Sequence, residues 1–212
     1  MKNKKAFLWD NDGVLVDTEK WFFEATRTIL VQAGHGLTRE QFIETTWVGS
    51  YGPWQQLKEN GIGEAEIRRL KTERDRLYTD YLLSQEVLIH GVRETVERFS
   101  RKYTMGIVTS SHPEHFDIIH ARTGLLPLFD FVLTREDYTH PKPDPEPYRL
   151  AAQRAGYSPE QCVSIEDSRR GLLASLGASV DCIIVPHPFT AGSDFSEAAL
   201  VLNDITELTG IL

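Results

Sequence analysis

Three aspartates stand within eight positions near the start of the chain, in the segment LWDNDGVLVDTEK. Asp10, Asp12 and Asp17 follow a short apolar run, and Gly13 allows a tight turn among them. Like charges at this spacing repel one another, and burial increases the cost. One carboxylate held in line can act as a nucleophile, and a second can exchange protons with a leaving group and with water. Asp10 and Asp12 have the spacing for these two roles.

Polar side chains also stand at the ends of three later apolar runs: hydroxyls, then an ammonium, then carboxylates. These residues are Thr109, Ser110, Ser111, Lys142, Glu166 and Asp167. In a parallel sheet, ligands bind beyond the carboxyl ends of the strands, so we expect these groups to share one crevice with Asp10 and Asp12. Oxygen ligands suit Mg²⁺, a hard cation that retains several waters. We expect Asp10 and Asp167 to bind it directly, with a backbone carbonyl near Asp12, and Glu166 to act through water.

The elements that must position these groups alternate along the chain. Short apolar runs predict buried strands at 5–9, 104–109, 130–133, 161–165 and 181–185. Helical patterns lie between the later runs, which is typical of a parallel sheet. The expected fold class is therefore α/β, with a Rossmann-like parallel sheet that carries helices on both faces.

Residues 17–86 interrupt this alternation and show only helical periodicity. Helices are predicted at about 18–33, 38–46, 53–60 and 63–85. An all-helical block between the first two strands favours an inserted cap domain, residues 17–86, on a catalytic core of 1–16 and 87–212. Asp17 precedes the first of these helices and is expected to be its N-cap.

Composition excludes several classes of function. The formal net charge is −8, and no basic run is clustered as a nucleic-acid-binding surface requires. Cys162 and Cys182 stand alone in strand-like segments and are expected to be buried thiols of a reducing compartment. No apolar run is long enough for a secretory signal or a membrane span. We expect a cytoplasmic protein, monomeric or weakly dimeric, without nucleic-acid or membrane partners.

Four segments together resemble the motifs of the haloacid dehalogenase superfamily, in the right order and over essentially the whole chain. They are DNDGV at 10–14, VTSS at 108–111, HPKPDP at 140–145 and IEDSRRG at 165–171. The helical block after DNDGVLVD resembles the branch with a small helical cap, which includes phosphoglycolate-phosphatase-like and β-phosphoglucomutase-like enzymes.

This resemblance implies a role for each motif residue. Asp10 would be the nucleophile and Asp12 the general acid and base. Thr109 or Ser110 would be the phosphate-binding hydroxyl, with Thr109 favoured by its place after the strand. Lys142 would stabilise charge and Asp167 would bind magnesium.

The cap segment TTWVGSYGPWQQL, residues 45–57, carries the candidate specificity residues. In the β-phosphoglucomutase-like branch, a glycine followed three positions later by an arginine marks a loop that grips a second phosphate. Gly49 matches the glycine, but Gly52 replaces the arginine, which weakens a mutase interpretation. Gly49 and Tyr51 are the candidate substrate-binding residues, while Trp54 is expected to pack inside the cap.

The hypothesis favoured by the sequence is a magnesium-dependent phosphatase that hydrolyses a small phosphorylated metabolite through an aspartyl-phosphate. A sugar phosphomutase shares this chemistry, and Gly52 speaks against it. A dehalogenase has no leaving alkoxide to protonate, so Asp12 argues against that activity. A non-catalytic metabolite-binding module would be expected to lack at least one of Asp10, Asp12, Lys142 and Asp167, and all four are present.

Overall fold

The computed structural model describes residues 3–48 and 51–211 of the chain. It divides into two compact units, one formed by the segments up to Asp17 and from Val87 onward, the other by Thr18–Glu86. We call them the α/β unit and the helical unit. Asp17 belongs to the α/β unit rather than to the helical block. Among the described residues, no helix is long and apolar enough to cross a membrane.

The α/β unit is built on a parallel sheet with the strand order β3-β2-β1-β4-β5-β6. The strands are β1 Ala6–Trp9, β2 Thr104–Val108, β3 Phe131–Leu133, β4 Cys162–Glu166, β5 Asp181–Ile184 and β6 Leu200–Val201. The first five lie within one residue of their predicted bounds, so the predicted fold class is confirmed. The sixth was not predicted: it has only two residues, and both are exposed although they are apolar.

The order in which the chain adds strands to the sheet reverses at the central strand, β1. Trp9 pairs in register with Ile107 of β2 on one side and with Ile165 of β4 on the other. After β1 the chain builds the sheet outward through β2 and β3, and then returns to build β4, β5 and β6 on the other side. The carboxyl ends of β1 and β4 therefore form the topological switch point, where open α/β sheets bind ligands.

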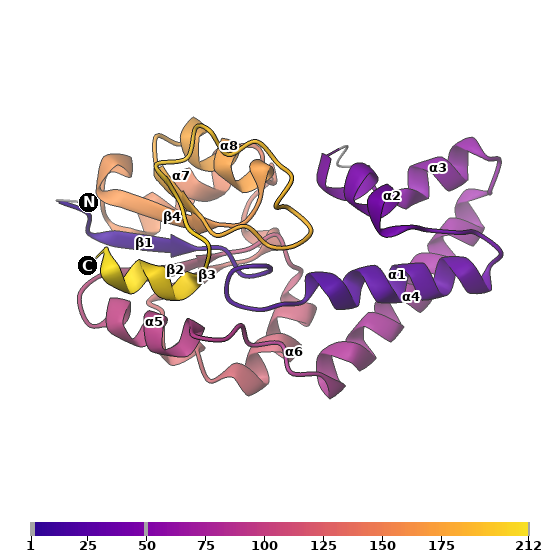
Figure 1. The fold of residues 1–212 in the computed structure, drawn as a ribbon, viewed down its shortest axis with the longest axis horizontal. Coiled ribbons are helices and arrows are strands. Elements are labelled where there is room, and N and C mark those ends of the chain that lie inside the picture. The colour runs from indigo at the N-terminus through magenta and orange to yellow at the C-terminus, as the bar shows by residue number, and fades with distance from the viewer. Residues whose placement is uncertain (1–2, 49–50, 212) are drawn as a thin grey trace. The chain divides into compact units, whose positions relative to one another are not determined.

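Helices cover both faces of this sheet (Figure 1). They are α5 Val92–Ser100, α6 Pro113–Thr123, α7 Glu146–Ala155 and α8 Arg169–Gly177. Helices α7 and α8 lie on one face, and α5 and α6 lie on the other (Figure 1). Alternate residues of β1 feed the two cores: Leu8 packs with Tyr148 of α7, while Phe7 meets Phe99 of α5 edge to face at 4.7 Å.

The helical unit consists of α1 Glu19–Gln32, α2 Arg39–Ile43, α3 Pro53–Glu59 and α4 Glu64–Ser84. A capping box starts α2: the Thr38 side chain accepts from the Gln41 backbone N–H, and the Gln41 side chain accepts from the Thr38 N–H. The helix predicted at 38–46 is in fact α2 followed by a π-helical turn, Glu44–Val48. Phe22, Phe42 and Tyr78 form an aromatic cluster inside this unit.

Two short segments of the α/β unit, 15–17 and 87–89, pair with each other; we call them the linker ribbon. The Asp17 N–H donates to the Val87 carbonyl at 2.7 Å, and Val16 and Leu88 form an antiparallel bridge. The N-cap prediction for Asp17 is wrong, because the N-cap of α1 is the next residue, Thr18. The Asp17 carboxylate instead lies 3.1 Å from Nε2 of His187.

Candidate active site

Asp10 stands at the switch point, directly after β1. Its backbone N–H donates to the Ile165 carbonyl at 2.9 Å, which continues the pairing with β4 one residue beyond the strand. The Lys142 ammonium donates to Asp10 Oδ1 at 3.0 Å and to the Val108 carbonyl at 2.9 Å. Burial and then the charge of Glu166 raise the pKa of Asp10 from 3.8 to about 7, against the opposing effect of Lys142.

Lys142 is held between two carboxylates from different strands. Its ammonium donates to Glu166 Oε1 at 2.6 Å as well as to Asp10, and both Lys142 and Glu166 are buried. Burial alone would lower the pKa of Lys142, but the charges of Asp10 and Glu166 outweigh it and the pKa is raised. Lys142 therefore remains charged beside Asp10.

Glu166 is also held by a tyrosine from α7. The Tyr148 hydroxyl donates to Glu166 Oε1 at 2.6 Å, and the Ser168 hydroxyl donates to Oε2 at 3.3 Å. Burial, followed by the charge of Glu166, raises the pKa of Tyr148 well above its ordinary value, so its hydroxyl keeps its proton and donates. This arrangement fixes the carboxylate that in turn positions Lys142.

Two glycines allow carboxylates to approach the backbone closely. A Cβ at Gly171, in the first turn of α8, would lie 1.8 Å from Cδ of Glu166. Gly13 has a φ of +84°, and a Cβ there would lie 2.4 Å from Oδ2 of Asp167. Both positions need glycine, because any larger residue would displace a carboxylate of the site.

A buried carboxylate cluster fits a divalent cation. Asp10, Glu166 and Asp167 each offer an oxygen, and these oxygens lie within 4.8 Å of one another. Burial, then the charges of Asp10 and Glu166, raise the pKa of Asp167 well above its ordinary value. Three buried carboxylates face one ammonium, that of Lys142, so a hard cation with oxygen ligands would offset the remaining charge. The residues present therefore suit Mg²⁺. The side chain of Asp12 is not part of this cluster.

Two of the hydroxyls that follow β2 donate hydrogen bonds to Asp12. Oδ2 of Asp12 accepts from Ser111 Oγ at 2.6 Å and from Thr109 Oγ1 at 3.3 Å. Thr109 is buried and also accepts from the Ser111 backbone N–H at 3.0 Å, whereas Ser110 is half-buried. The choice between Thr109 and Ser110 as the phosphate-binding hydroxyl stays a prediction.

The sequence places Ser111 in this crevice but assigns it no partner, because nothing in the TSS pattern shows that the turn brings the third residue back to Asp12. Tyr148 is not predicted at all. Tyr148 lies on the buried side of an amphipathic helix and is indistinguishable in sequence from an ordinary core aromatic. Its hydroxyl reaches Glu166 because α7 packs across β1, β2 and β3.

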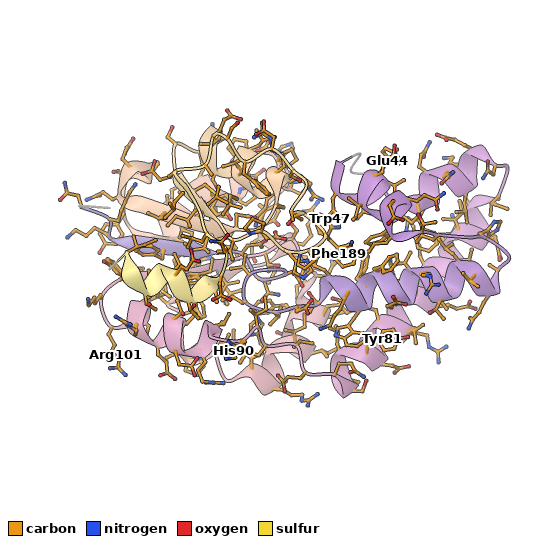
Figure 2. All side chains as sticks on the ribbon, viewed as in Figure 1. Glu44, Trp47, Tyr81, His90, Arg101 and Phe189 are labelled. Carbon is orange, nitrogen blue, oxygen red and sulfur yellow. The ribbon has the colours of Figure 1, made fainter. Side chains whose placement is uncertain are left out.

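The specificity residues predicted in the helical unit are only partly visible. Gly49 lies outside the described residues. Tyr51 is 53% exposed. Trp54 lies beneath the cations of Lys71 and Arg74, at 5.7 and 5.4 Å from the ring centroid, so it packs within the helical unit. Trp47, labelled in Figure 2, belongs to the π-helical turn, and its indole N–H is buried without a hydrogen-bond partner among the residues that the structure describes.

Known proteins resemble the chain over nearly its whole length. The model of a family described as haloacid dehalogenase-like hydrolase matches residues 7–185. Protein CbbY of Rhodobacter capsulatus is 27% identical over 213 residues, which cover 95% of this chain and 94% of that protein. The phosphorylated carbohydrates phosphatase of Thermotoga maritima is 29% identical over 203 residues, which cover 93% of this chain and 92% of that protein.

A solved structure shares the fold as well as the sequence likeness. The crystal structure of CbbY from Rhodobacter sphaeroides in complex with phosphate has a TM-score of 0.79 and 25% sequence identity. The match covers 97% of this chain and 96% of that one.

Proposed function

Because the chain belongs to the haloacid dehalogenase-like hydrolase family, we propose that it is a magnesium-dependent phosphatase for small phosphorylated metabolites. The observation that carries this proposal is the placement of Asp10: it follows the central strand, lies 3.0 Å from the Lys142 ammonium, and belongs to a three-carboxylate cluster. A nucleophile at the switch point, beside a fixed cation, is the arrangement that phosphoryl transfer to a carboxylate requires.

In the proposed first step, the Asp10 carboxylate attacks the phosphorus of the substrate. The bond from phosphorus to the leaving oxygen breaks, and Asp12 gives that oxygen a proton. The product is an aspartyl-phosphate on Asp10 and a free alcohol. Lys142 stabilises the negative charge that spreads over the phosphoryl oxygens.

In the proposed second step, water attacks the phosphorus of the aspartyl-phosphate. Asp12, now ionised, takes a proton from this water, and Asp10 leaves as a carboxylate while inorganic phosphate is released. Asp10 and Asp167 would hold magnesium, with Glu166 close by, and the ion would supply positive charge that offsets the carboxylates and polarises the phosphoryl group. The site is thereby restored for another substrate molecule.

We assign substrate choice to the helical unit, acting as a cap. The residues proposed for the chemistry address only phosphate and metal, and all of them lie in the α/β unit. A relative that is named for phosphorylated carbohydrates supports that class as the first substrates to test. Tyr51 and Gly49 remain the proposed contacts to the substrate.

The test is release of phosphate from a panel of sugar phosphates, nucleotides and short phosphorylated acids, with magnesium and with a chelator. Asp10→Asn removes the nucleophile, and Asp181→Asn is the matched control, because Asp181 is an exposed carboxylate at the amino end of β5. We expect turnover that needs magnesium, is lost in Asp10→Asn and is unchanged in Asp181→Asn. Equal turnover by the unsubstituted protein and Asp10→Asn would refute the proposal.

A further inference from the structure

A chain of buried polar side chains runs from helix α6 to Asp12. Asn11, which is fully buried, lies with its Oδ1 2.8 Å from Nε2 of His120 and its Nδ2 3.3 Å from Oδ2 of Asp12. Nδ1 of His120 lies 2.9 Å from Oγ1 of Thr123, and that oxygen also accepts from the Leu125 backbone N–H at 3.3 Å. His120 and Thr123 are buried as well. We call these residues the Asn11–His120–Thr123 chain.

The Asn11 amide fixes the direction of every hydrogen bond in this chain. Nδ2 of Asn11 can only donate, and it donates to Oδ2 of Asp12. Oδ1 of Asn11 therefore faces Nε2 of His120 and must accept, so Nε2 carries the ring proton. Nδ1 is then an acceptor, and the Thr123 hydroxyl donates to it at 2.9 Å.

The chain requires a neutral histidine, and its surroundings provide one. Burial lowers the pKa of His120 from 6.5 to about 4, with Asp12 and Asp117 opposing this effect. The Phe116 ring packs on the imidazole with the centroids 4.4 Å apart. At neutral pH one ring nitrogen therefore donates and the other accepts, as the chain needs.

The chain ends on an oxygen that two hydroxyls also approach. Oδ2 of Asp12 accepts hydrogen bonds from Asn11 Nδ2, Ser111 Oγ and Thr109 Oγ1. The proton that Asp12 exchanges with substrate and water must be carried by one of its two oxygens. Three donors on Oδ2 orient the carboxylate and keep that atom as an acceptor. A proton on Oδ2 would have to displace one of these three donors, so the catalytic proton is exchanged at Oδ1.

We propose that Asn11, His120 and Thr123 are positioning residues that turn the Asp12 carboxylate so that Oδ1 exchanges the catalytic proton. The role of Asp12 as acid and base rests on the proposed function. The direction of the hydrogen bonds does not, since it follows from the donors and acceptors alone.

The first experiment measures the direction of these hydrogen bonds without any activity. A long-range ¹H–¹⁵N spectrum of the imidazole rings, with His120 assigned by comparison with His120→Phe, identifies the protonated ring nitrogen. We expect the proton on Nε2 at neutral pH. A proton on Nδ1 would reverse the Asn11 amide, direct its oxygen at Asp12, and overturn the proposal.

The second experiment separates positioning from structural support. His120→Phe alone leaves the buried Asn11 amide oxygen without a hydrogen-bond donor. Asn11→Leu combined with His120→Phe removes both partners of this hydrogen bond, so neither is left buried and unpaired. We expect the double variant to unfold at a urea concentration close to that of the unsubstituted protein. Its kcat for an alkyl phosphate should still be lower by about tenfold or more, with KM little changed.

Leaving-group dependence shows whether proton transfer is what was lost. Nitrophenolate needs little protonation to depart, so the first turnover of 4-nitrophenyl phosphate by the double variant should fall much less than turnover of the alkyl phosphate. The control is Ser164→Ala with Ser175→Ala, which removes another buried pair, with its hydroxyls 2.7 Å apart, from the same unit. This control should affect both substrates equally.

Two outcomes would overturn the positioning role. The first is a double variant with the kcat as well as the stability of the unsubstituted protein. The second is an equal loss of turnover for the alkyl phosphate and for 4-nitrophenyl phosphate. Failure of the unsubstituted protein to hydrolyse either substrate would instead refute the proposed function. The tautomer measurement then decides by itself whether the chain has the stated direction.

Discussion

Replacement of Gly171 by alanine adds a single methyl group at the most crowded point of the site. The new Cβ would lie 1.8 Å from Cδ of Glu166, whereas ordinary van der Waals contacts begin at 3.4 Å. Because Gly171 is in α8 and Glu166 ends β4, both backbones are fixed by regular hydrogen bonding. The carboxylate must therefore retreat by roughly 1.6 Å, since the backbones do not yield.

The cost of this retreat follows from the contacts that Glu166 makes. Its 2.6 Å hydrogen bonds with Lys142 and with Tyr148 would stretch beyond hydrogen-bonding distance. Overpacking a core typically costs about 1–3 kcal/mol, and separating a buried ion pair adds to this. Alanine recovers about 1 kcal/mol of helix propensity over glycine. We expect a net loss of about 3 kcal/mol in the free energy of unfolding.

The assay combines urea unfolding with phosphate release from the best substrate of the panel. Gly177→Ala is the matched control, because it makes the same change in the same helix, where the new Cβ would lie 3.2 Å from Cβ of Pro145. That contact needs an adjustment of only a few tenths of an ångström, so the gain in helix propensity should roughly cancel it. We expect the control to stay within about 1 kcal/mol of the unsubstituted protein and to retain its activity.

In Gly171→Ala, turnover should fall along with stability, because Lys142 loses the carboxylate that holds it beside Asp10. If Gly171→Ala were as stable and as active as Gly177→Ala, Glu166 would have room to move without consequence. The reasoning that a rigid Glu166 positions Lys142 would then be refuted.

Three other properties of the protein can be tested in the same way. Lys142→Met leaves two carboxylates, including Glu166, buried without their cation, so we expect a loss of about 3–5 kcal/mol in the free energy of unfolding, together with the loss of phosphate release; unchanged unfolding in urea would contradict this. Burial lowers the pKa of His120 to about 4, while the unfolded chain has the ordinary value of 6.5 and takes up a proton first. Stability is therefore fully present above pH 6.5 and falls by up to about 3 kcal/mol as the pH drops toward 4; this slope should be missing from urea unfolding of His120→Phe at the same pH values. Burial raises the pKa of Cys162 to about 11 and of Cys182 to about 12, so a thiol reagent at pH 7 should label them only as the protein unfolds, and rapid labelling of the native protein would be the opposite result.

Most strands were predictable from the sequence because they are buried on both faces and are therefore largely apolar. The segment AFLW predicts β1, and all four of its residues are buried. The same logic fails for β6, whose two residues are exposed at the edge of the sheet. Helical periodicity has a limit of its own at 44–48, where the pattern continues but the backbone hydrogen bonding becomes that of a π-helix.

The positions of the candidate residues were predictable for a different reason. Parallel strands end at one edge of the sheet, so polar groups that follow β1 and β4 must meet, as Asp10 and Glu166 do. Which groups pair there was not predictable, because it depends on the packing of helices. The Tyr148 hydroxyl and the His120 imidazole come from α7 and α6, and neither carries a sequence signal that distinguishes it from an ordinary buried side chain.

The N-cap prediction for Asp17 failed by one residue, since Thr18 holds that position. An aspartate just before a helix favours an N-cap role on local grounds. His187, which follows β5 and stacks on Phe189, lies 3.1 Å from the Asp17 carboxylate. Nothing within the first twenty residues indicates such a partner.

For the α/β unit, the helical unit is a single long loop. The linker ribbon holds the two ends of this loop together by backbone hydrogen bonds. The Asp17 N–H and the Val87 carbonyl are hydrogen-bonded at 2.7 Å, so the chain leaves and re-enters at one point. The entropy of closing a loop grows only with the logarithm of its length, so an insertion of about 70 residues costs about 2–3 kcal/mol more than a turn of about four residues. The two ends would accept a different insertion, or a short turn, without changing the register of the sheet. The part proposed to choose the substrate is therefore exchangeable, while the part proposed to perform the chemistry is kept.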